Sequence, residues 1–166
     1  MKIRTSLTSP FGRKTRIAAH HLGLKVEVEP ASANAPGSTL ALDNPLGKMP
    51  VMIMDDGRRV YDSRVINEAL DILAGGGKIV PADPGARIDA LVLQALGDGI
   101  MDAGILVVYE GRMRPESARH APWVEYQRDK LKRGLVALAA KPPDPKVVTV
   151  GAIAVACALG YIDWRK

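Results

Sequence analysis

The stretch Asn44–Leu70, NPLGKMPVMIMDDGRRVYDSRVINEAL, decides the fold. A turn and a proline precede a short apolar run, and Asp55-Asp56-Gly57 separates this run from a second one. An Asp-Gly pair between two such runs is typical of a β-hairpin, because glycine readily adopts the positive φ angle of a tight turn. The sequence therefore predicts strands over 51–54 and 58–61, followed by a helix over 63–73.

The residues before this stretch predict a βαβ unit. Residues 2–7 alternate apolar and polar side chains, as a half-buried strand does. Ser9-Pro10 is typical of a helix start, since serine caps free backbone N–H groups and proline fits the first helical position. We expect this helix over 10–22, closed by Gly23, and a second strand over 24–29.

Apolar residues at the spacing of one face predict the core of this first domain. The residues expected to point inward are Ile17, Ala18, Leu22, Val65, Ile66, Ala69, Leu70 and Leu73, and Val26 and Val28 are expected to share one face of their strand. The basic cluster Arg13-Lys14-Thr15-Arg16 is interpreted as the solvated face of the first helix. Residues 30–43 are rich in Ala, Ser, Asn, Pro and Gly, and are predicted to form a loop with at most one weak helical turn.

The second half of the chain is predicted to be helical. Residues 74–86 contain three consecutive glycines and two prolines, a composition typical of a connection. Beyond them, helices are predicted over 87–112, 118–140 and 149–162. The expected organisation is an α/β domain (βαβ-ββα, residues 1–76), a linker (77–86) and an all-α domain (87–166).

Four residues of these helices carry specific expectations. Gly97, Gly99 and Gly104 lie in the first helix, where each glycine costs up to about 1 kcal/mol relative to alanine, which suggests close packing or the approach of another backbone or ligand. Thr149 is expected to cap the last helix, although the carboxylate that often completes such a cap three residues later is missing.

Composition restricts the class of protein. The chain is 47% hydrophobic and 25% charged, as in ordinary globular proteins. No uninterrupted apolar run reaches the roughly 18 residues of a membrane span, and no signal peptide is visible, so no membrane partner is expected. The single cysteine, Cys157, excludes an internal disulfide framework and fits the cytoplasm. It lies in an apolar run and is expected to be buried and inert.

The net charge of +5 does not indicate nucleic-acid binding, because the basic residues are scattered and only 4% of residues are aromatic. Attraction of small anions fits the same charges better. His20-His21 have no partners at ligand spacing, so no metal is expected.

Three motifs together resemble the bacterial glutathione S-transferases. They are Thr8-Ser9-Pro10-Phe11 with Arg13-Lys14, then Asn44–Val51, and then Tyr61–Ile66. Further matches at 95–103 and 153–161 extend the resemblance over most of the chain; the middle block is the most specific, and the first and last are weaker alone. The resemblance implies a thioredoxin-like domain that binds glutathione, followed by a helical domain. Members of this family usually continue for several tens of residues beyond the last matching helix, so this chain is expected to be shortened.

The resemblance also implies roles for individual residues, with glutathione as the co-substrate. The candidate glutathione-binding residues are Ser9, Phe11, Lys48, Met49, Pro50, Asp62 and Ser63. The Met49-Pro50 bond is expected to be cis, with the Met49 backbone paired to the cysteine of glutathione, and a trans proline that begins a strand is the alternative. Lys48 either meets a glutathione carboxylate or is an exposed turn residue.

Asp62 and Ser63 open a helix, and both are common capping residues. In the functional interpretation, Ser63 and the free N–H groups of the helix receive the γ-glutamyl carboxylate, while Asp62 faces the ligand's ammonium. The two interpretations are compatible, because an anion can bind where a helix is capped.

Ser9 is the candidate catalytic residue, and Thr8 is the alternative. The thiolate is the nucleophile, and a hydroxyl that donates to sulfur at a helix N-terminus favours it. Capping alone would also explain Ser9. Because residues 8–13 contain no cysteine, redox chemistry through a protein thiol is not expected. Asp98 and Asp102, four residues apart, either line the second-substrate cleft between the domains or lie on a solvated face.

The sequence therefore predicts a cytoplasmic, dimeric glutathione S-transferase-like protein that conjugates glutathione to an apolar small-molecule electrophile, a reaction of detoxification. The alternative is a non-catalytic member of the same fold that binds glutathione or a protein, and the shortened C-terminus favours this alternative.

Overall fold

A computed structural model describes residues 1–165, and the chain divides into two compact units, Met1–Ile88 and Asp89–Lys166. The elements are β1 (Lys2–Thr5), α1 (Pro10–His21), β2 (Glu27–Pro30), α2 (Leu40–Asp43), β3 (Val51–Ile53), β4 (Arg59–Val60), α3 (Ser63–Leu73), α4 (Pro84–Met113), the 3₁₀ helix η1 (Glu116–Ala118), α5 (Ala121–Ala140) and α6 (Val150–Trp164). The predicted order, βαβ, then ββα, then helices alone, is confirmed.

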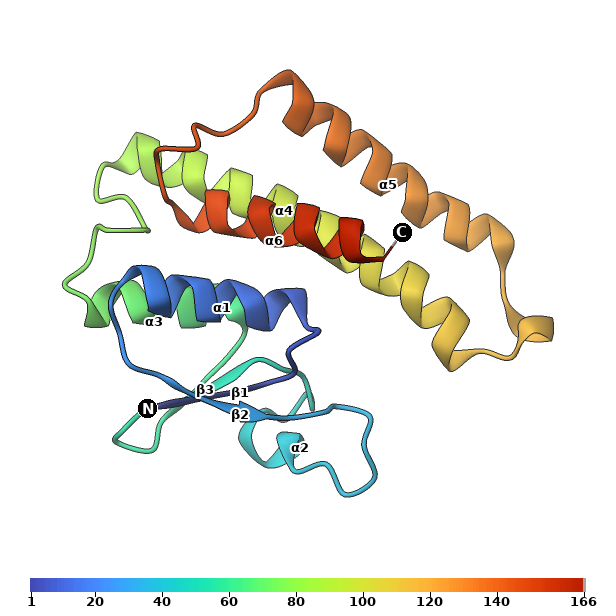
Figure 1. Ribbon diagram of the computed structural model, residues 1–166, viewed down its shortest axis with the longest axis horizontal. Coiled ribbons are helices and arrows are strands. Elements are labelled where there is room, and N and C mark those ends of the chain that lie inside the picture. The colour runs from blue at the N-terminus through green and yellow to red at the C-terminus, as the bar shows by residue number, and fades with distance from the viewer. Residues whose placement is uncertain (166) are drawn as a thin grey trace. The chain divides into compact units, whose positions relative to one another are not determined.

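The first unit is built on a four-stranded sheet in the order β2-β1-β3-β4. β1 is parallel to β2 and antiparallel to β3, and β3 is antiparallel to β4. Helices α1 and α3 cover one face of this sheet, while α2 lies on the other side (Figure 1). Arg4 is opposite Val51 and Met52 is opposite Val60, so β1 and β4 both end beside the start of β3.

The core of the first unit lies between the sheet and the helix pair α1–α3. Its fully buried apolar side chains include Ile3, Val51, Met52, Ala18, Ile66 and Leu70. The inward positions predicted for Ala18, Ile66 and Leu70 are therefore confirmed. The inward positions predicted for Ile17, Val65 and Leu73 are wrong, because these three side chains are exposed.

Several predicted bounds shift by a few residues. The first strand ends at Thr5 because its pairing with β2 ends there, opposite Pro30. The second strand begins at Glu27, where its pairing with Lys2 begins, and not at residue 24. The positive φ angles of Gly23 and Gly57 agree with their predicted places after α1 and in the hairpin. Helix α3 has the predicted bounds, whereas α4 begins three residues before the predicted start, at Pro84.

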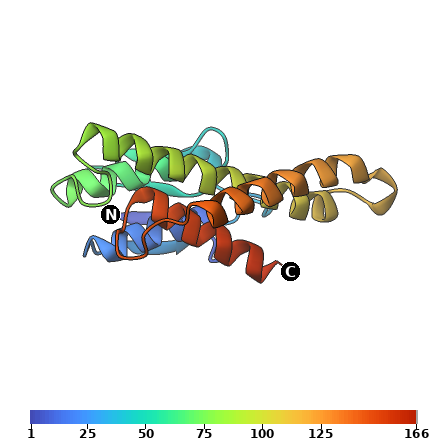
Figure 2. The ribbon, with the colours of Figure 1, turned by 90° about the horizontal axis from the view of Figure 1, so that it is seen from above.

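The second unit contains two helices, α4 and α6, that lie against each other along glycines. A Cβ at Gly97 would lie 2.8 Å from the carbonyl carbon of Ala154, and one at Gly151 would lie 2.6 Å from the carbonyl oxygen of Ala90. Gly104 packs against the ring of Tyr161. The close packing predicted for the α4 glycines is thus confirmed at Gly97 and Gly104, but it is wrong for Gly99, where nothing lies within 4 Å of the position of a Cβ. Helix α5 runs back from the turn after α4 (Figure 2).

Two further expectations for the second unit can be compared with the structure. The Thr149 hydroxyl accepts a hydrogen bond from the Ala152 N–H at 3.2 Å, so Thr149 caps α6 as predicted. Cys157 is fully buried, as predicted. Among residues 1–165, α4 is the one helix that is long and apolar enough to cross a membrane, a property that core helices of globular proteins share.

Candidate functional site

Three segments of the first unit meet at one end of the sheet. They are the turn between β1 and α1, the residues just before β3, and the start of α3, which the strand pairing brings to the same end. Two contacts tie them together: the Ser6 N–H donates to the Met49 sulfur at 3.1 Å, and Lys14 Nζ donates to Ser63 Oγ at 3.3 Å. The motifs that the sequence singled out therefore converge, although they are far apart along the chain.

Ser9 is the N-cap of α1. Its Oγ accepts a hydrogen bond from the Gly12 N–H at 3.1 Å, as predicted for a capping serine. Since the oxygen acts as the acceptor in this bond, the hydroxyl hydrogen is left to donate elsewhere. The Thr8 hydroxyl is exposed and pairs with Ser6 Oγ at 3.2 Å. Ser9 thus lies at the positive end of the α1 dipole, whereas Thr8 lies outside the helix.

Gly12 holds the start of α1 close to the sheet. A Cβ at this position would overlap the side chain of Thr5, the last residue of β1. Because only hydrogen fits between them, the helix begins directly over the end of β1. This close approach fixes the position of the Ser9 hydroxyl relative to the residues before β3.

The Met49–Pro50 bond is cis, as predicted. The turn before it is shaped by buried Asn44, whose Oδ1 accepts from the Leu46 N–H and whose Nδ2 donates to the Lys48 carbonyl at 2.9 Å. Within residues 1–165, no backbone hydrogen bond is recorded for the N–H or C=O of Met49. These two groups are therefore available to pair with an extended ligand. The Lys48 side chain is exposed.

Asp62 is the N-cap of α3 and follows a cis Tyr61–Asp62 peptide. Its Oδ1 accepts from the Arg64 N–H at 2.9 Å, and its Oδ2 pairs with the Arg64 guanidinium at 3.2 Å. Partial burial acts to raise the pKa of Asp62, but these two bonds to Arg64, with a smaller effect of the Lys14 charge, lower it overall. The carboxylate is therefore ionised near neutral pH.

Ser63 is the first residue of α3 and is only 2% exposed. Among the described residues, no acceptor is recorded for its backbone N–H, which belongs to the unpaired first turn of the helix. The start of α3 thus combines an available N–H group, a hydroxyl and the positive end of a helix dipole, the features that favour bound anions.

Lys14 is a residue of this region whose place the sequence analysis missed. It is 0% exposed, and Thr15 beside it is also fully buried, so the interpretation of the basic cluster as a solvated face is wrong for both. Phe11, one turn earlier, is half-buried, with its ring centroid 5.9 Å from Lys14 Nζ. The spacing of Lys14 from Ala18, four residues later on the predicted inward face, was the signal that could have revealed its burial.

Asp98 and Asp102 belong to α4 in the second unit. Asp98 is 4% exposed, so the solvated-face interpretation is wrong for it, whereas Asp102 is exposed. Their role in a second-substrate site stays a prediction.

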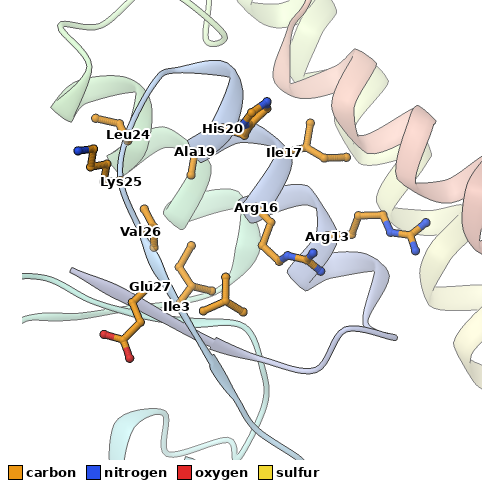
Figure 3. Close-up of a pocket in the computed structure, with 11 residues that line it drawn as sticks. Ile3, Arg13, Arg16, Ile17, Ala19, His20, Leu24, Lys25, Val26 and Glu27 are labelled. Carbon is orange, nitrogen blue, oxygen red and sulfur yellow. The ribbon is translucent and has the colours of Figure 1, made fainter.

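A pocket of about 750 Å³ lies beside α1 and β2. Figure 3 shows Arg16 projecting from α1 near Ile3, whereas Arg13 projects from the same helix away from Ile3 and Val26. None of the predicted glutathione residues line this pocket, so it is separate from the site described above. No group of three or more His, Cys, Asp or Glu side chains suited to a metal occurs in the described part of the chain.

Comparison with known proteins identifies the family. Residues 8–73 match the model of the glutathione S-transferase N-terminal domain. The whole chain is 34% identical to the uncharacterized GST-like protein YibF of Escherichia coli K12, and it spans 84% of that protein. The chain belongs to the glutathione S-transferase family. The predicted fold class, a thioredoxin-like domain followed by a helical one, is confirmed with it.

Two solved structures of family members are similar over nearly the whole chain. A glutathione S-transferase from Methylobacillus flagellatus KT with glutathione bound is 37% identical and has a TM-score of 0.92. A glutathione transferase family member from Pseudomonas fluorescens Pf-5, also with bound glutathione, is 39% identical and has a TM-score of 0.90. In each case 99% of this chain and 83% of the other chain are covered.

Proposed function

We propose that the protein binds glutathione in the first unit and joins its thiolate to an apolar electrophile. The observation that carries this proposal is that the backbone N–H and C=O of Met49, directly before β3, are available for hydrogen bonding. This arrangement presents a short antiparallel edge to an extended peptide, and glutathione is a peptide of the right length for it. The glutathione-bound family members of similar structure support the same ligand.

Each end of glutathione has a chemically suitable partner. The γ-glutamyl carboxylate binds Ser63 and the N-terminus of α3, where the helix dipole favours an anion. The ligand's ammonium faces Asp62, whose lowered pKa keeps it ionised. The cysteine residue pairs with the Met49 backbone, the exposed Lys48 is within the segment that would meet the glycyl carboxylate, and Phe11 supplies an apolar contact.

The chemical step is assigned to Ser9. Its hydroxyl donates a hydrogen bond to the sulfur, which stabilises the thiolate and lowers the pKa of the thiol from about 8.5. The thiolate then attacks an electrophilic carbon. A carbon–sulfur bond forms, and the leaving group departs with its electron pair, while the thiol proton passes to solvent. The protein contributes binding, orientation and a lowered thiol pKa.

We also propose that the protein is a cytoplasmic homodimer that acts in detoxification. Val65 and Ile72 of α3 are exposed apolar side chains, which a second copy would cover. Gly97 and Gly104 of α4 pack against α6 of the same chain. Sedimentation equilibrium tests the assembly: a mass of one chain at micromolar concentration would contradict it.

The binding test is titration calorimetry of the folded protein with glutathione. We expect saturable binding of one glutathione per chain at or below millimolar concentration. Ophthalmic acid, in which a methyl group replaces the thiol, is a matched control ligand, and it is expected to bind through the same peptide contacts. Absence of binding at millimolar glutathione would refute the proposed function.

The catalytic test compares Ser9→Ala with Thr8→Val in a conjugation assay with an aryl halide. We expect Ser9→Ala to lower kcat/KM at least tenfold, in the range typical of a lost transition-state hydrogen bond, and Thr8→Val to leave it within about twofold. The reverse result would assign the role to Thr8. If the parent protein binds glutathione but turns over no electrophile, the non-catalytic binding protein is the correct alternative.

A further inference from the structure

The structure buries a lysine directly behind the predicted anion site. Lys14 is 0% exposed, although a lysine is almost never fully buried unless a partner compensates the loss of hydration. It lies on the face of α1 that packs against α3, and its Nζ reaches the first residue of that helix. An apolar side chain of similar length would fill this position without the cost of burying a charge.

The hydrogen bond between Lys14 and Ser63 has only one possible direction. An ammonium has three donors and no acceptor, so Ser63 Oγ must be the acceptor in this 3.3 Å contact. The hydroxyl hydrogen of Ser63 is then turned away from Lys14. Within residues 1–165 no acceptor is recorded for it, and it is left to donate to a ligand. Because Ser63 is almost wholly buried, the direction of this hydrogen decides whether the serine can bind an anion.

The positive charge of Lys14 also acts at the N-terminus of α3. The other cation near the start of α3, Arg64, is exposed and therefore screened by solvent. Lys14 is buried, where a charge is screened much less, and it contributes to the lowered pKa of Asp62. A carboxylate at the N-terminus of α3 would thus meet the helix dipole, a directed hydroxyl and a buried positive charge.

We propose that Lys14 is a positioning residue for glutathione, which sets Ser63 as a hydrogen-bond donor to the γ-glutamyl carboxylate and supplies the buried charge behind it. This inference rests on the proposed function, since it concerns the same ligand. A residue of the domain interior would thus take part in binding the γ-glutamyl carboxylate.

The test compares two ligands in calorimetry. One is glutathione, and the other is its analogue with a 4-aminobutanoyl group in place of the γ-glutamyl group, which lacks only that carboxylate. In Lys14→Met we expect the Kd for glutathione to rise about tenfold, as for a lost charge-assisted hydrogen bond, and the Kd for the analogue to change less than about twofold. Lys14→Arg, which keeps the charge, should recover part of the loss.

Arg13→Met is the matched control, because it removes the same charge from the adjacent, exposed position of α1. It should leave both Kd values within about twofold. Equal weakening of both ligands in Lys14→Met would overturn the proposal and leave glutathione binding by the parent intact. An equal effect of Arg13→Met and Lys14→Met would overturn it as well, because net charge would then be the cause.

A second variant keeps the proposal testable if Lys14→Met does not fold, as its circular dichroism would reveal. Ser63→Ala removes the hydroxyl through which Lys14 acts, and it should weaken glutathione about tenfold but the analogue less than about twofold. If Ser63→Ala weakens both ligands equally, the proposal is refuted. If the parent binds neither ligand, the proposed function and this inference fail together, which is distinct from every outcome above.

Discussion

Gly97 of α4 and Ala154 of α6 are so close that a Cβ on the glycine would lie 2.8 Å from the carbonyl carbon of the alanine. The contact is with backbone, which cannot move aside as a side-chain tip can. We expect Gly97→Ala to destabilise the protein by about 1–3 kcal/mol, as overpacking does. Thermal unfolding followed by circular dichroism measures the change.

Gly99, on the same helix, is the control for this prediction. Nothing lies within 4 Å of the position of its Cβ, so Gly99→Ala should raise stability by up to about 1 kcal/mol through helix propensity. Destabilisation by both variants to the same extent would contradict the close contact between α4 and α6.

Ser9 is expected to have two separable roles, since its oxygen caps α1 and its hydrogen is free to donate. Ser9→Ala should lose about 1 kcal/mol of stability together with thiol activation. Ser9→Asp keeps a capping acceptor but has no donor, so it should retain the stability and lose the activation. Chemical denaturation measures the first quantity, and the thiolate absorbance of bound glutathione at varied pH measures the second. If Ser9→Asp lowers the pKa of the bound thiol as much as the parent protein does, the Ser9 hydroxyl is excluded from the mechanism.

Asp43 should make stability depend on acid pH. Its carboxylate accepts from Arg59 Nε at 2.8 Å and pairs with Arg4, and these bonds, with Arg59 contributing most, lower its pKa despite burial. A carboxyl with a lowered folded pKa stabilises the protein above its unfolded pKa of about 3.9, and this contribution is lost as the pH falls through the lower folded value.

Asp43→Asn should therefore cost about 1–3 kcal/mol at pH 7, because it removes the charge that Arg4 and Arg59 share, while Arg4 keeps its ion pair with Glu29. The difference from the parent should shrink at pH values below about 4. Urea denaturation of both proteins across this range checks the prediction, and a difference that stays constant with pH would contradict it.

Asp71 should hold in place the segment that follows α3, residues 74–80. Its buried carboxylate accepts from the N–H groups of Gly77 and Lys78 and, at 2.8 Å, from that of Ile79. Asp71→Ala leaves these donors without a partner and should cost about 2–4 kcal/mol. Limited proteolysis should then cleave within residues 74–80. Asp83→Ala, which removes one exposed bond to the Ala86 N–H, should cost about 1 kcal/mol or less and leave this segment resistant.

The sequence predicted the features that depend on neighbouring residues. The bounds of α3, the caps at Ser9 and Thr149, and the turn at Gly57 follow from local patterns, and the structure agrees with them. Lys14 was misplaced because the burial of one helical residue depends on which element covers that face, and residues 13–16 contain no sign of α3.

In the candidate site, too, local motifs were predicted and contacts between distant residues were not. Met49-Pro50 and Asp62-Ser63 were found from local motifs and a family resemblance, whereas the contact from Lys14 to Ser63 joins residues 49 positions apart. Such a contact exists only after the helices have packed, so no spacing within one element predicts it. The same holds for the glycine contacts between α4 and α6, where the sequence indicated closeness but not the partner.

The order of the strands leaves β2 and β4 at the open edges of the sheet. Unpaired edges invite association with other chains and are a common origin of aggregation. Here β2 is short, exposes Glu27 and ends with Pro30, which has no N–H to offer an incoming strand, while β4 has only two residues. Edge-to-edge association of two copies is therefore disfavoured, which leaves helical surfaces as the route by which this protein can assemble without aggregating.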